Sequence, residues 1–302
     1  MSALGGPGIE NLQTESPTDR TRFNPTRWAH FAWGLCSNLP TQIRILHTFS
    51  KPPFLRLLLG DPARPFSFLN RNYLARQLTV AQRAHSLLHH YKRIHASLPN
   101  QTLRQILASG LIVYETCRDA SLFRVTLDLT GTIYWEGELS LHLEVNGVAV
   151  CILSFSIVPG SVAGALANEV LLVACVQSAK GCESQIRLAT KSMLDVAPPA
   201  LLVAALQGVA AALGIHAMAG TCATIQSSYL QEHCSLFQDA YDNFFATLGA
   251  TKNSAGFFCS PLPLEEKPLP LIPKGHKIRV RKKREFKRQV AESVAQSLLK
   301  IG

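Results

Sequence analysis

The sequence lacks the motifs that mark several common protein classes. Its eight cysteines include no C-x-x-C pair, and several lie within apolar runs, which predicts reduced core residues in a cytosolic protein. Residues 1–24 contain no basic segment followed by an apolar run, so no secretory signal is expected. There is no internal repeat and no complete set of catalytic residues. These absences favour a cytoplasmic location. Any activity must be inferred from less specific sequence features.

The apolar content is sufficient for a large core. Hydrophobic residues make up 47% of the 302-residue chain, which fits one large domain or a smaller domain with extensions. Residues 196–218 carry no charge, but Pro198, Pro199, Gly208 and Gly214 interrupt them. Because a membrane span needs about 20 continuous apolar residues, a buried helix followed by a strand is favoured here over a span.

Charge is distributed unevenly along the chain. Residues 1–105 hold 13 Lys and Arg against 4 Asp and Glu, and residues 274–302 hold 10 against 2, so the segment between them, with 7 against 14, is acidic. Clustered cations gain by neutralising fixed phosphates. The sequence therefore predicts basic ends that face an anionic partner, either a phospholipid surface or a nucleic acid.

The spacing of apolar residues predicts helices first and a sheet afterwards. Residues 80–98 repeat apolar side chains every three or four positions, which indicates a helix with Arg83 off its packing face. From Ser121 the period is two, and Asn146-Gly147 supplies a type I′ hairpin turn. Further along, expected helices over 184–194, 199–213 and 238–248 alternate with strands over 170–176, 215–222 and 256–260.

The predicted fold class is α/β (α+β), with a mixed sheet that opens as an antiparallel meander and has flanking helices. We expect a basic, mostly helical region (1–105), an α/β domain (106–262) and a proline-rich connector with a basic C-terminal helix (263–302). In that last helix an apolar stripe lies beside the basic run and is formed by Phe286, Val290, Val294 and Leu298.

The order of several short motifs resembles the VirK/YbjX family from about residue 74 to residue 287. The family usually has glycine after the glutamine that ends this strand, whereas Ser178 follows Gln177 here. The resemblance implies a bacterial protein linked to virulence, envelope integrity and tolerance of antimicrobial peptides. The motifs are His90-Tyr91, Glu136-Gly137-Glu138-Leu139-Ser140-Leu141, Leu153-Ser154-Phe155-Ser156, Gln177, Thr190-Lys191, Pro199, Asp239-x-Tyr241-Asp242-x-Phe244 and Lys282-Lys283-Arg284 with Arg288.

The element order also resembles the acyltransferase fold of the GNAT superfamily. That resemblance implies a coenzyme A pyrophosphate bound at a glycine-rich helix N-terminus. Here the corresponding turn, residues 195–199, lacks glycine and contains two prolines, and Phe245 stands near the place of a general-acid tyrosine. Both differences argue against ordinary acetyl transfer. Coenzyme A or another acyl donor is therefore a cofactor only under an alternative hypothesis of group transfer.

Six polar residues are candidates for one pocket. Glu136 and Glu138 lie two apart on an expected strand and so share a face, as a pair of acid/base carboxylates would; the alternative is a solvated face. The other four are Gln177, Thr190, Lys191 and Asp242. They could bind a phosphate or acyl oxygen near the point where the antiparallel meander ends and helices begin to alternate with strands. Their alternative roles are capping, packing and surface structure.

Metal and nucleic-acid sites have weaker support. His85 and His89 have the i, i+4 spacing of a zinc-binding pair, but no third ligand is indicated, so no metal is predicted. The basic cluster at the C-terminal end has no base-reading motif beside it, which favours an anionic membrane over nucleic acid. The cluster consists of Arg279, Arg281, Lys282, Lys283, Arg284, Lys287 and Arg288.

Two functional hypotheses follow. In the first, the chain supports the cell envelope from the cytoplasmic side, as a peripheral protein on the inner face of the cytoplasmic membrane or on an envelope-assembly protein. In the second, it is an acyl- or other group-transfer enzyme with an altered GNAT-like site that acts on lipid or cell-wall precursors. The sequence carries no signature of an oligomeric state.

Overall fold

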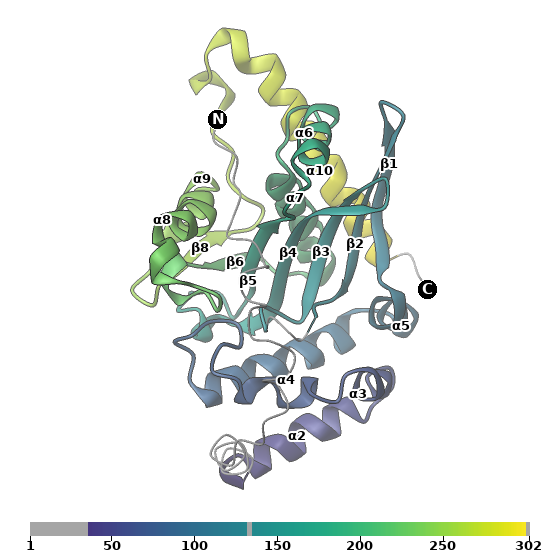
Figure 1. The fold of residues 1–302 in the computed structure, drawn as a ribbon, viewed down its shortest axis with the longest axis vertical. Helices are drawn as coiled ribbons and strands as arrows, with labels where there is room; N and C mark the ends of the chain where they lie inside the picture. The colour runs from purple at the N-terminus through teal and green to yellow at the C-terminus, as the bar shows by residue number, and fades with distance from the viewer. Residues whose placement is uncertain (1–35, 132–134, 300–302) are drawn as a thin grey trace.

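The computed structural model describes residues 36–131 and 135–299, so the expectation about a signal in residues 1–24 lies outside them. One eight-stranded sheet runs through the molecule in the order β1-β2-β3-β4-β5-β6-β8-β7 (Figure 1). The predicted α/β class, with a mixed sheet and flanking helices, is confirmed. The strands are β1 (Leu111–Arg118), β2 (Ser121–Leu129), β3 (Leu139–Val145), β4 (Val148–Pro159), β5 (Glu169–Ser178), β6 (Ala217–Thr221), β7 (Thr251–Lys252) and β8 (Phe257–Pro261).

Strands β1 to β5 form an antiparallel meander. Alternate residues of β2 are buried and pair with apolar residues of β3, which is the period-two pattern read from the sequence. The turn between β3 and β4 has φ of 51° at Asn146 and 81° at Gly147, as a type I′ turn requires. The predicted meander and turn are confirmed. The edge strand β1 was not predicted, because its outer half alternates without burying an apolar face.

Strands β5 and β6 are parallel, so a crossover must join them. It contains α6 (Glu183–Ser192) and α7 (Pro198–Leu213). Helix α7 is apolar nearly all round because the sheet and another helix cover it on opposite sides. The uncharged segment thus forms a buried helix and a strand, as expected. Among residues 36–131 and 135–299, no helix has the length and apolarity needed to cross a membrane.

The N-terminal helices form a layer at one end of the sheet (Figure 1). The predicted helix over 80–98 is confirmed as α4 (Val80–Ser97), which begins with a capping box of Thr79 and Gln82. Arg83 was expected off the buried face but is only 5% exposed. Its Nε donates to Phe68 O at 2.8 Å and its Nη1 to Leu78 O at 2.6 Å, so loop carbonyls replace water around this cation. The other elements of the layer are α2 (Leu39–Phe49), α3 (Leu55–Gly60), η3 (Arg64–Leu69) and α5 (Asn100–Ser109).

The expected helix over 238–248 is built from three pieces. These are α8 (Cys234–Phe237), the π-helical η7 (Gln238–Asn243) and α9 (Phe244–Thr247). The turn after them contains Gly249 at φ 79°, as predicted for a helix end. Phe245 packs on β6 at Gly220, where a Cβ would lie 2.2 Å from the ring. This glycine therefore lets the helical segment approach the sheet.

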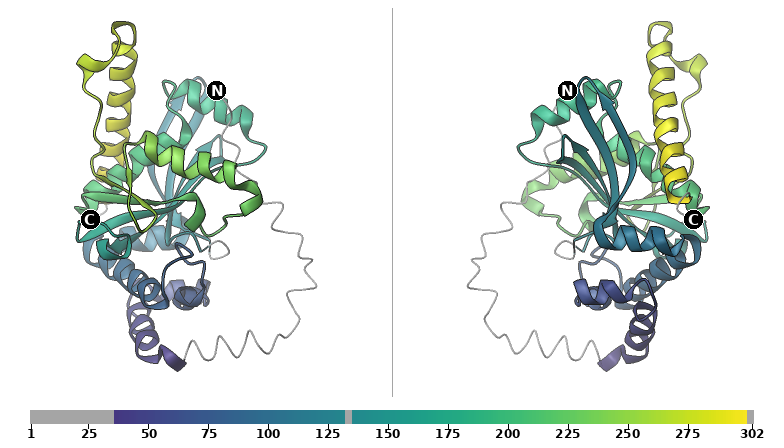
Figure 2. Two further views of the ribbon diagram at one scale, coloured as in Figure 1. Left: turned by 90° about the vertical axis from the view of Figure 1, so that its left-hand side faces the viewer. Right: turned by 90° about the vertical axis from the view of Figure 1, so that its right-hand side faces the viewer.

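Helix α10 (Lys277–Leu299) has two unlike halves. Its predicted apolar stripe is buried, with exposed fractions of 0–2% at Phe286, Val290, Val294 and Leu298, and packs on α7 and β1. A Cβ at Gly208 of α7 would lie 2.3 Å from Ala291 O, so the two helices are in close contact. The first turns of α10 instead rise beyond the rest of the body (Figure 2). The stripe therefore belongs to the core and is not a membrane-facing surface.

Candidate functional site

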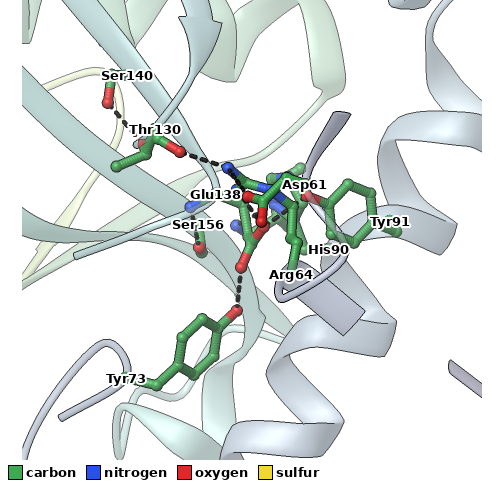
Figure 3. Close-up of polar contacts among 10 residues, drawn as sticks. Asp61, Arg64, Tyr73, His90, Tyr91, Thr130, Glu138, Ser140 and Ser156 are labelled. Atoms are coloured by element: carbon green, nitrogen blue, oxygen red, sulfur yellow. Dashed lines mark hydrogen bonds and ion pairs between the residues drawn. The ribbon is translucent and has the colours of Figure 1, made fainter. Parts of the chain in front are cut away.

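Glu138 lies at the centre of a buried polar cluster between the sheet and the N-terminal helices (Figure 3). Its carboxylate accepts hydrogen bonds from Arg64 Nη1 at 3.0 Å and from Tyr73 Oη at 2.7 Å, and also from Tyr91 Oη. Arg64 Nη2 donates to Thr130 O, and the Glu138 N–H donates to Ser156 Oγ at 3.0 Å. A carboxylate with this many donors is held in one position, so the cluster fixes the N-terminal layer on the sheet.

Burial determines the protonation of the groups around Glu138. It raises the pKa of both Tyr73 and Tyr91, and the Glu138 carboxylate raises them further, so both phenols remain donors. Burial opposes the charge of Arg64, but the Glu138 and Asp61 carboxylates outweigh it and raise its pKa. For His90, burial, with His89 and Arg64, lowers the pKa to about 3. This imidazole is therefore neutral and accepts the Ile157 N–H at Nδ1.

Glu136 lies in a second buried cluster, on the side of the sheet where η7 packs. Its Oε1 accepts from Gln226 Nε2 at 2.6 Å, Ser227 Oγ at 3.0 Å and Ser228 Oγ at 2.9 Å. The same carboxylate interacts with the Cys175 thiol on β5, which in turn interacts with Tyr241 on η7. Three segments that are distant in sequence thus meet at Glu136.

The Glu136 cluster supplies hydrogen bonds and not a thiolate. Burial, reinforced by Glu136, raises the pKa of Cys175 well above its usual range. Burial also raises the pKa of Tyr241, which lies beside that thiol. Because the thiolate is the nucleophilic form of cysteine, Cys175 is a weak nucleophile here. The arrangement can position a polar group or stabilise the loop, and it offers no activated nucleophile.

Both glutamates are buried, with exposed fractions of 7% for Glu136 and 1% for Glu138, so neither lies on a solvated face. They point into different clusters, since Gly137 between them has φ 138° and lies against the Phe155 backbone. The pair therefore does not act as two carboxylates on one substrate atom. The physical reason is that the backbone at Gly137, which lies close to β4, departs from the regular alternation of a strand.

The remaining candidates are spread over the molecule. Gln177 follows Cys175 by two residues on β5 and shares its sheet face, so it lies near the Glu136 cluster. The Asp242 carboxylate accepts the Ala223 N–H at 2.6 Å and pairs with Lys252 at 3.3 Å. On α6, Thr190 donates to Ile186 O, and Lys191 is exposed. Among the described residues, no hydrogen bond or ion pair joins any two of the six candidates, and Gln177 shares only the sheet face of Cys175, which contacts Glu136.

The sheet face that carries Gln177 is polar. Cross-strand register places Asp128, Ser140, Ser154 and Cys175 in one row across β2 to β5, because directly opposed residues share a face. Ser140 Oγ bonds to Ser154 Oγ at 2.8 Å and to Thr130 Oγ1 at 2.6 Å. The next row contains Thr126, His142, Ile152 and Gln177.

Several members of these clusters were missed from the sequence. Arg64 and Tyr73 lie in a region read as loops and short helices, and Cys175 was read as an ordinary core residue. Serines at alternate positions of β3 and β4 could have signalled a polar sheet face, since Ser140, Ser154 and Ser156 keep the strand period. Nothing local indicates that Arg64 would reach a carboxylate 74 residues away.

The basic residues of α10 differ in their partners. Arg279 pairs with Asp195 at 2.7 Å, Arg284 with Glu266 at 3.4 Å and Arg288 with Glu285 at 3.3 Å, and Lys283 donates to Asp195 O at 2.7 Å. Within the part of the chain that the structure describes, no carboxylate lies within 4.0 Å of Arg281, Lys282 or Lys287. The predicted cluster is therefore partly neutralised and partly free.

The predicted histidine pair does not form a metal site with its neighbours. His89 Nε2 lies 3.0 Å from the Glu169 carboxylate, which Arg93 also binds. Across residues 36–131 and 135–299 there is no group of three His, Cys, Asp or Glu side chains placed to hold a metal ion.

Comparison with known proteins identifies a family without an assigned activity. A family model described as "Protein of unknown function (DUF535)" matches residues 22–296, and this is the family also known as VirK/YbjX. No curated protein matches the chain, and no solved structure matches it. The likeness to the GNAT fold therefore stays a prediction.

Proposed function

We propose that this chain, which belongs to the DUF535 family, is a peripheral protein of the bacterial cytoplasmic membrane that supports envelope integrity, tolerance of antimicrobial peptides and virulence. It would bind the anionic inner face of that membrane through the segment that projects from the body at the start of α10. We call this segment the basic tip and define it by Leu271, Lys274, Lys277, Ile278, Arg281 and Lys282.

The observation that carries the proposal is the combination of free cations and exposed apolar side chains in the basic tip. Ile278 is 65% exposed and Leu271 63%, which is high for large apolar residues. Within the described ranges, the tip's four cations have no carboxylate within ion-pair distance. Apolar side chains among unpaired cations are typical of interfacial helices.

The expected attraction is adequate for reversible attachment. A lysine or arginine near an anionic leaflet contributes about 1 kcal/mol, so four cations contribute about 4 kcal/mol. Insertion of Leu271 and Ile278 adds to this value by burying apolar surface. Because the electrostatic part is screened, binding should weaken as the salt concentration rises.

The test is co-sedimentation of the full chain with vesicles of phosphatidylglycerol and phosphatidylcholine at low salt. We expect binding only when the anionic lipid is present, and at least a tenfold loss in a variant with Lys274→Gln, Lys277→Gln, Arg281→Gln and Lys282→Gln. These substitutions leave the buried stripe of α10 intact. Removal of residues 274–302 would delete part of the core and is the poorer experiment.

A matched control separates the tip from overall charge. A second variant with Arg44→Gln, Lys51→Gln, Arg56→Gln and Arg104→Gln removes the same number of charges from exposed positions of the N-terminal layer and should bind vesicles like the unchanged protein. Equal losses in the two variants would contradict attachment through the tip. So would indifference of the unchanged protein to anionic lipid.

The cellular part of the proposal has its own test. A bacterial strain without this protein should become more sensitive to a cationic antimicrobial peptide, and the unchanged chain, but not the tip variant, should restore tolerance. Restoration by the tip variant would favour an envelope-assembly protein as the partner. Stabilisation of the chain by coenzyme A or an acyl carrier in a thermal-shift assay would favour group transfer instead.

A further inference from the structure

A cavity of about 330 Å³ lies at the base of the basic tip, within the size range of ligand sites. Three segments build its walls. Arg118 comes from the end of β1, Leu194 from the turn between α6 and α7, and Arg281, Lys282 and Phe286 from α10. The cavity is therefore formed by the tertiary structure and not by one helix.

The cavity is cationic. Three cations and one carboxylate, that of Glu285, line it, and Glu285 is engaged by Arg288 at 3.3 Å. The Arg118 guanidinium lies over the Phe286 ring, 4.7 Å from its centroid. It also hydrogen-bonds to the Tyr114 side chain and makes a long 3.5 Å contact with Ser192 O. The ring and the Tyr114 side chain thus orient a guanidinium whose five N–H donors are not all used by these contacts.

An unusual turn forms one rim of the cavity. Leu194 and Asp195 both have positive φ, 56° and 57°, a conformation that costs free energy for residues other than glycine. Asp195 binds Arg279 through its side chain and Lys283 through its carbonyl oxygen, which fixes α10 against the turn. Leu194 is left 37% exposed beside the cations, so an apolar contact adjoins the anion-binding groups.

We infer that this cavity, which we call the anion pocket, binds the phosphomonoester headgroup of a single anionic lipid; the inference rests on the proposed attachment of the basic tip to a membrane. A phosphomonoester carries a charge of about −1.5 to −2 and three acceptor oxygens, which matches Arg118, Arg281 and Lys282. The apolar rim at Leu194 would contact the glycerol and first acyl carbons. A free phosphate shares the headgroup chemistry but not this contact.

The test compares headgroups on the full chain. Vesicles containing phosphatidic acid, a phosphomonoester, and vesicles containing phosphatidylglycerol, a phosphodiester, are matched in surface charge. We expect several-fold tighter binding to phosphatidic acid. Arg118→Gln should remove that preference, about a tenfold effect for a lost charged hydrogen-bond donor, while binding to phosphatidylglycerol persists.

Two further variants make the result specific. Arg118→Lys keeps the charge but loses the planar fork, so it should retain part of the preference. Lys277→Gln removes a cation of the tip that does not line the cavity, and it should weaken binding to both lipids equally. Circular dichroism of each variant checks the fold. An Arg118→Gln protein that is folded and keeps the full preference would overturn the anion pocket without affecting the basic tip.

Soluble probes identify the source of the phosphate. Titration calorimetry with dihexanoyl phosphatidic acid below its micelle concentration should show binding that Arg118→Gln abolishes, and inorganic phosphate should bind much more weakly. Equal binding of inorganic phosphate would overturn the lipid assignment. Absence of binding by both soluble probes and of any headgroup preference would overturn the pocket, whereas absence of all vesicle binding would overturn the tip as well.

Discussion

The two basic regions of this protein differ in that only the N-terminal one contains fully buried cations in the described structure. In the N-terminal layer, Arg64 and Arg83 are 4% and 5% exposed and are bound by a carboxylate or by backbone carbonyls. At the start of α10, Arg281 and Lys282 are exposed. Two cations of the first region therefore stabilise the fold from within, whereas those at the start of α10 form a charged surface. Net charge alone does not distinguish these uses.

This difference bears on the expectation that both basic ends face outward, because part of the N-terminal charge is exposed and part is buried. Arg76 donates to the carbonyls of Ser227 and Tyr229, and Arg93 pairs with Glu169. With Arg64, three described arginines of the N-terminal region thus bind the body of the protein, whereas Arg83 binds carbonyls within its own region. The reason is that the acidic and carbonyl-rich sheet ends lie next to this layer. The described part of this region therefore contains both buried and exposed cations, and α10 is the surface that we propose for an anionic partner.

The strongest test of the comparison is loss of a buried arginine. Arg64→Ala should lower the free energy of unfolding by about 3–5 kcal/mol, because it leaves the buried Glu138 carboxylate without its cation. Arg281→Ala should change it by less than about 0.5 kcal/mol. Urea denaturation followed by circular dichroism measures both. Similar values for the two variants would remove the distinction between the regions.

His90 provides a pH-dependent test of the N-terminal layer. Its pKa is about 3 in the folded chain and 6.5 when unperturbed, so the unfolded chain binds one more proton between these values. The stability contribution is present above pH 6.5 and is lost as the pH falls toward 3, by about 1.4 kcal/mol per pH unit.

The measurement is urea denaturation at several values between pH 6.5 and 4.5, with His90→Gln as the comparison. Glutamine can still accept the Ile157 N–H but does not titrate, so its stability should vary less with pH. Parallel pH profiles for the two proteins would show that His90 is not the responsible group.

Substitution of two glycines compares the packing around the buried half of α10 with the packing next to its basic start. Gly208→Ala should destabilise the protein by about 1–3 kcal/mol through overpacking, because the new Cβ would meet the α10 backbone. Gly275→Ala, with nothing within 4 Å of its Cβ position, should be nearly neutral. Thermal unfolding compares the two, and a neutral Gly208→Ala would argue against tight packing of α7 on α10.

The smallest effect is expected at the surface ion pair of the α6–α7 turn. Asp195→Asn removes the partner of Arg279 but keeps a residue type that tolerates positive φ. Because both side chains are about half exposed, the loss should be below about 1 kcal/mol and should shrink in high salt. A larger loss that salt does not reduce would mean that the pair is a structural anchor like Arg64.

Much of the fold could be predicted from local patterns. The meander followed from strict alternation in β2 and β3, and the helix α4 from its three- and four-residue spacing. The hairpin at Asn146-Gly147 followed from residues that tolerate positive φ. The edge strand β1 was not predicted because one of its faces is exposed. The π-helical form of η7 was not predicted because its residue spacing departs from that of an α-helix only locally.

The candidate site was less predictable. Strand periodicity placed the candidates Glu136 and Glu138 on one face, but the close approach of Gly137 to the Phe155 backbone accompanies their separation into two clusters. The side chains around their carboxylates come from positions 39 or more residues away. Periodicity carries information over a few residues, and these contacts depend on how distant elements meet.

The sequence by itself determined the elements, since apolar period, turn residues and prolines act on a chain segment through its own backbone. It also determined that the chain carries excess positive charge at both ends. Only the tertiary structure decided which cations are buried and which remain exposed, because the free energy of a charge depends on its solvation and its neighbours. The same argument makes Arg64 part of the core and Arg281 part of a surface.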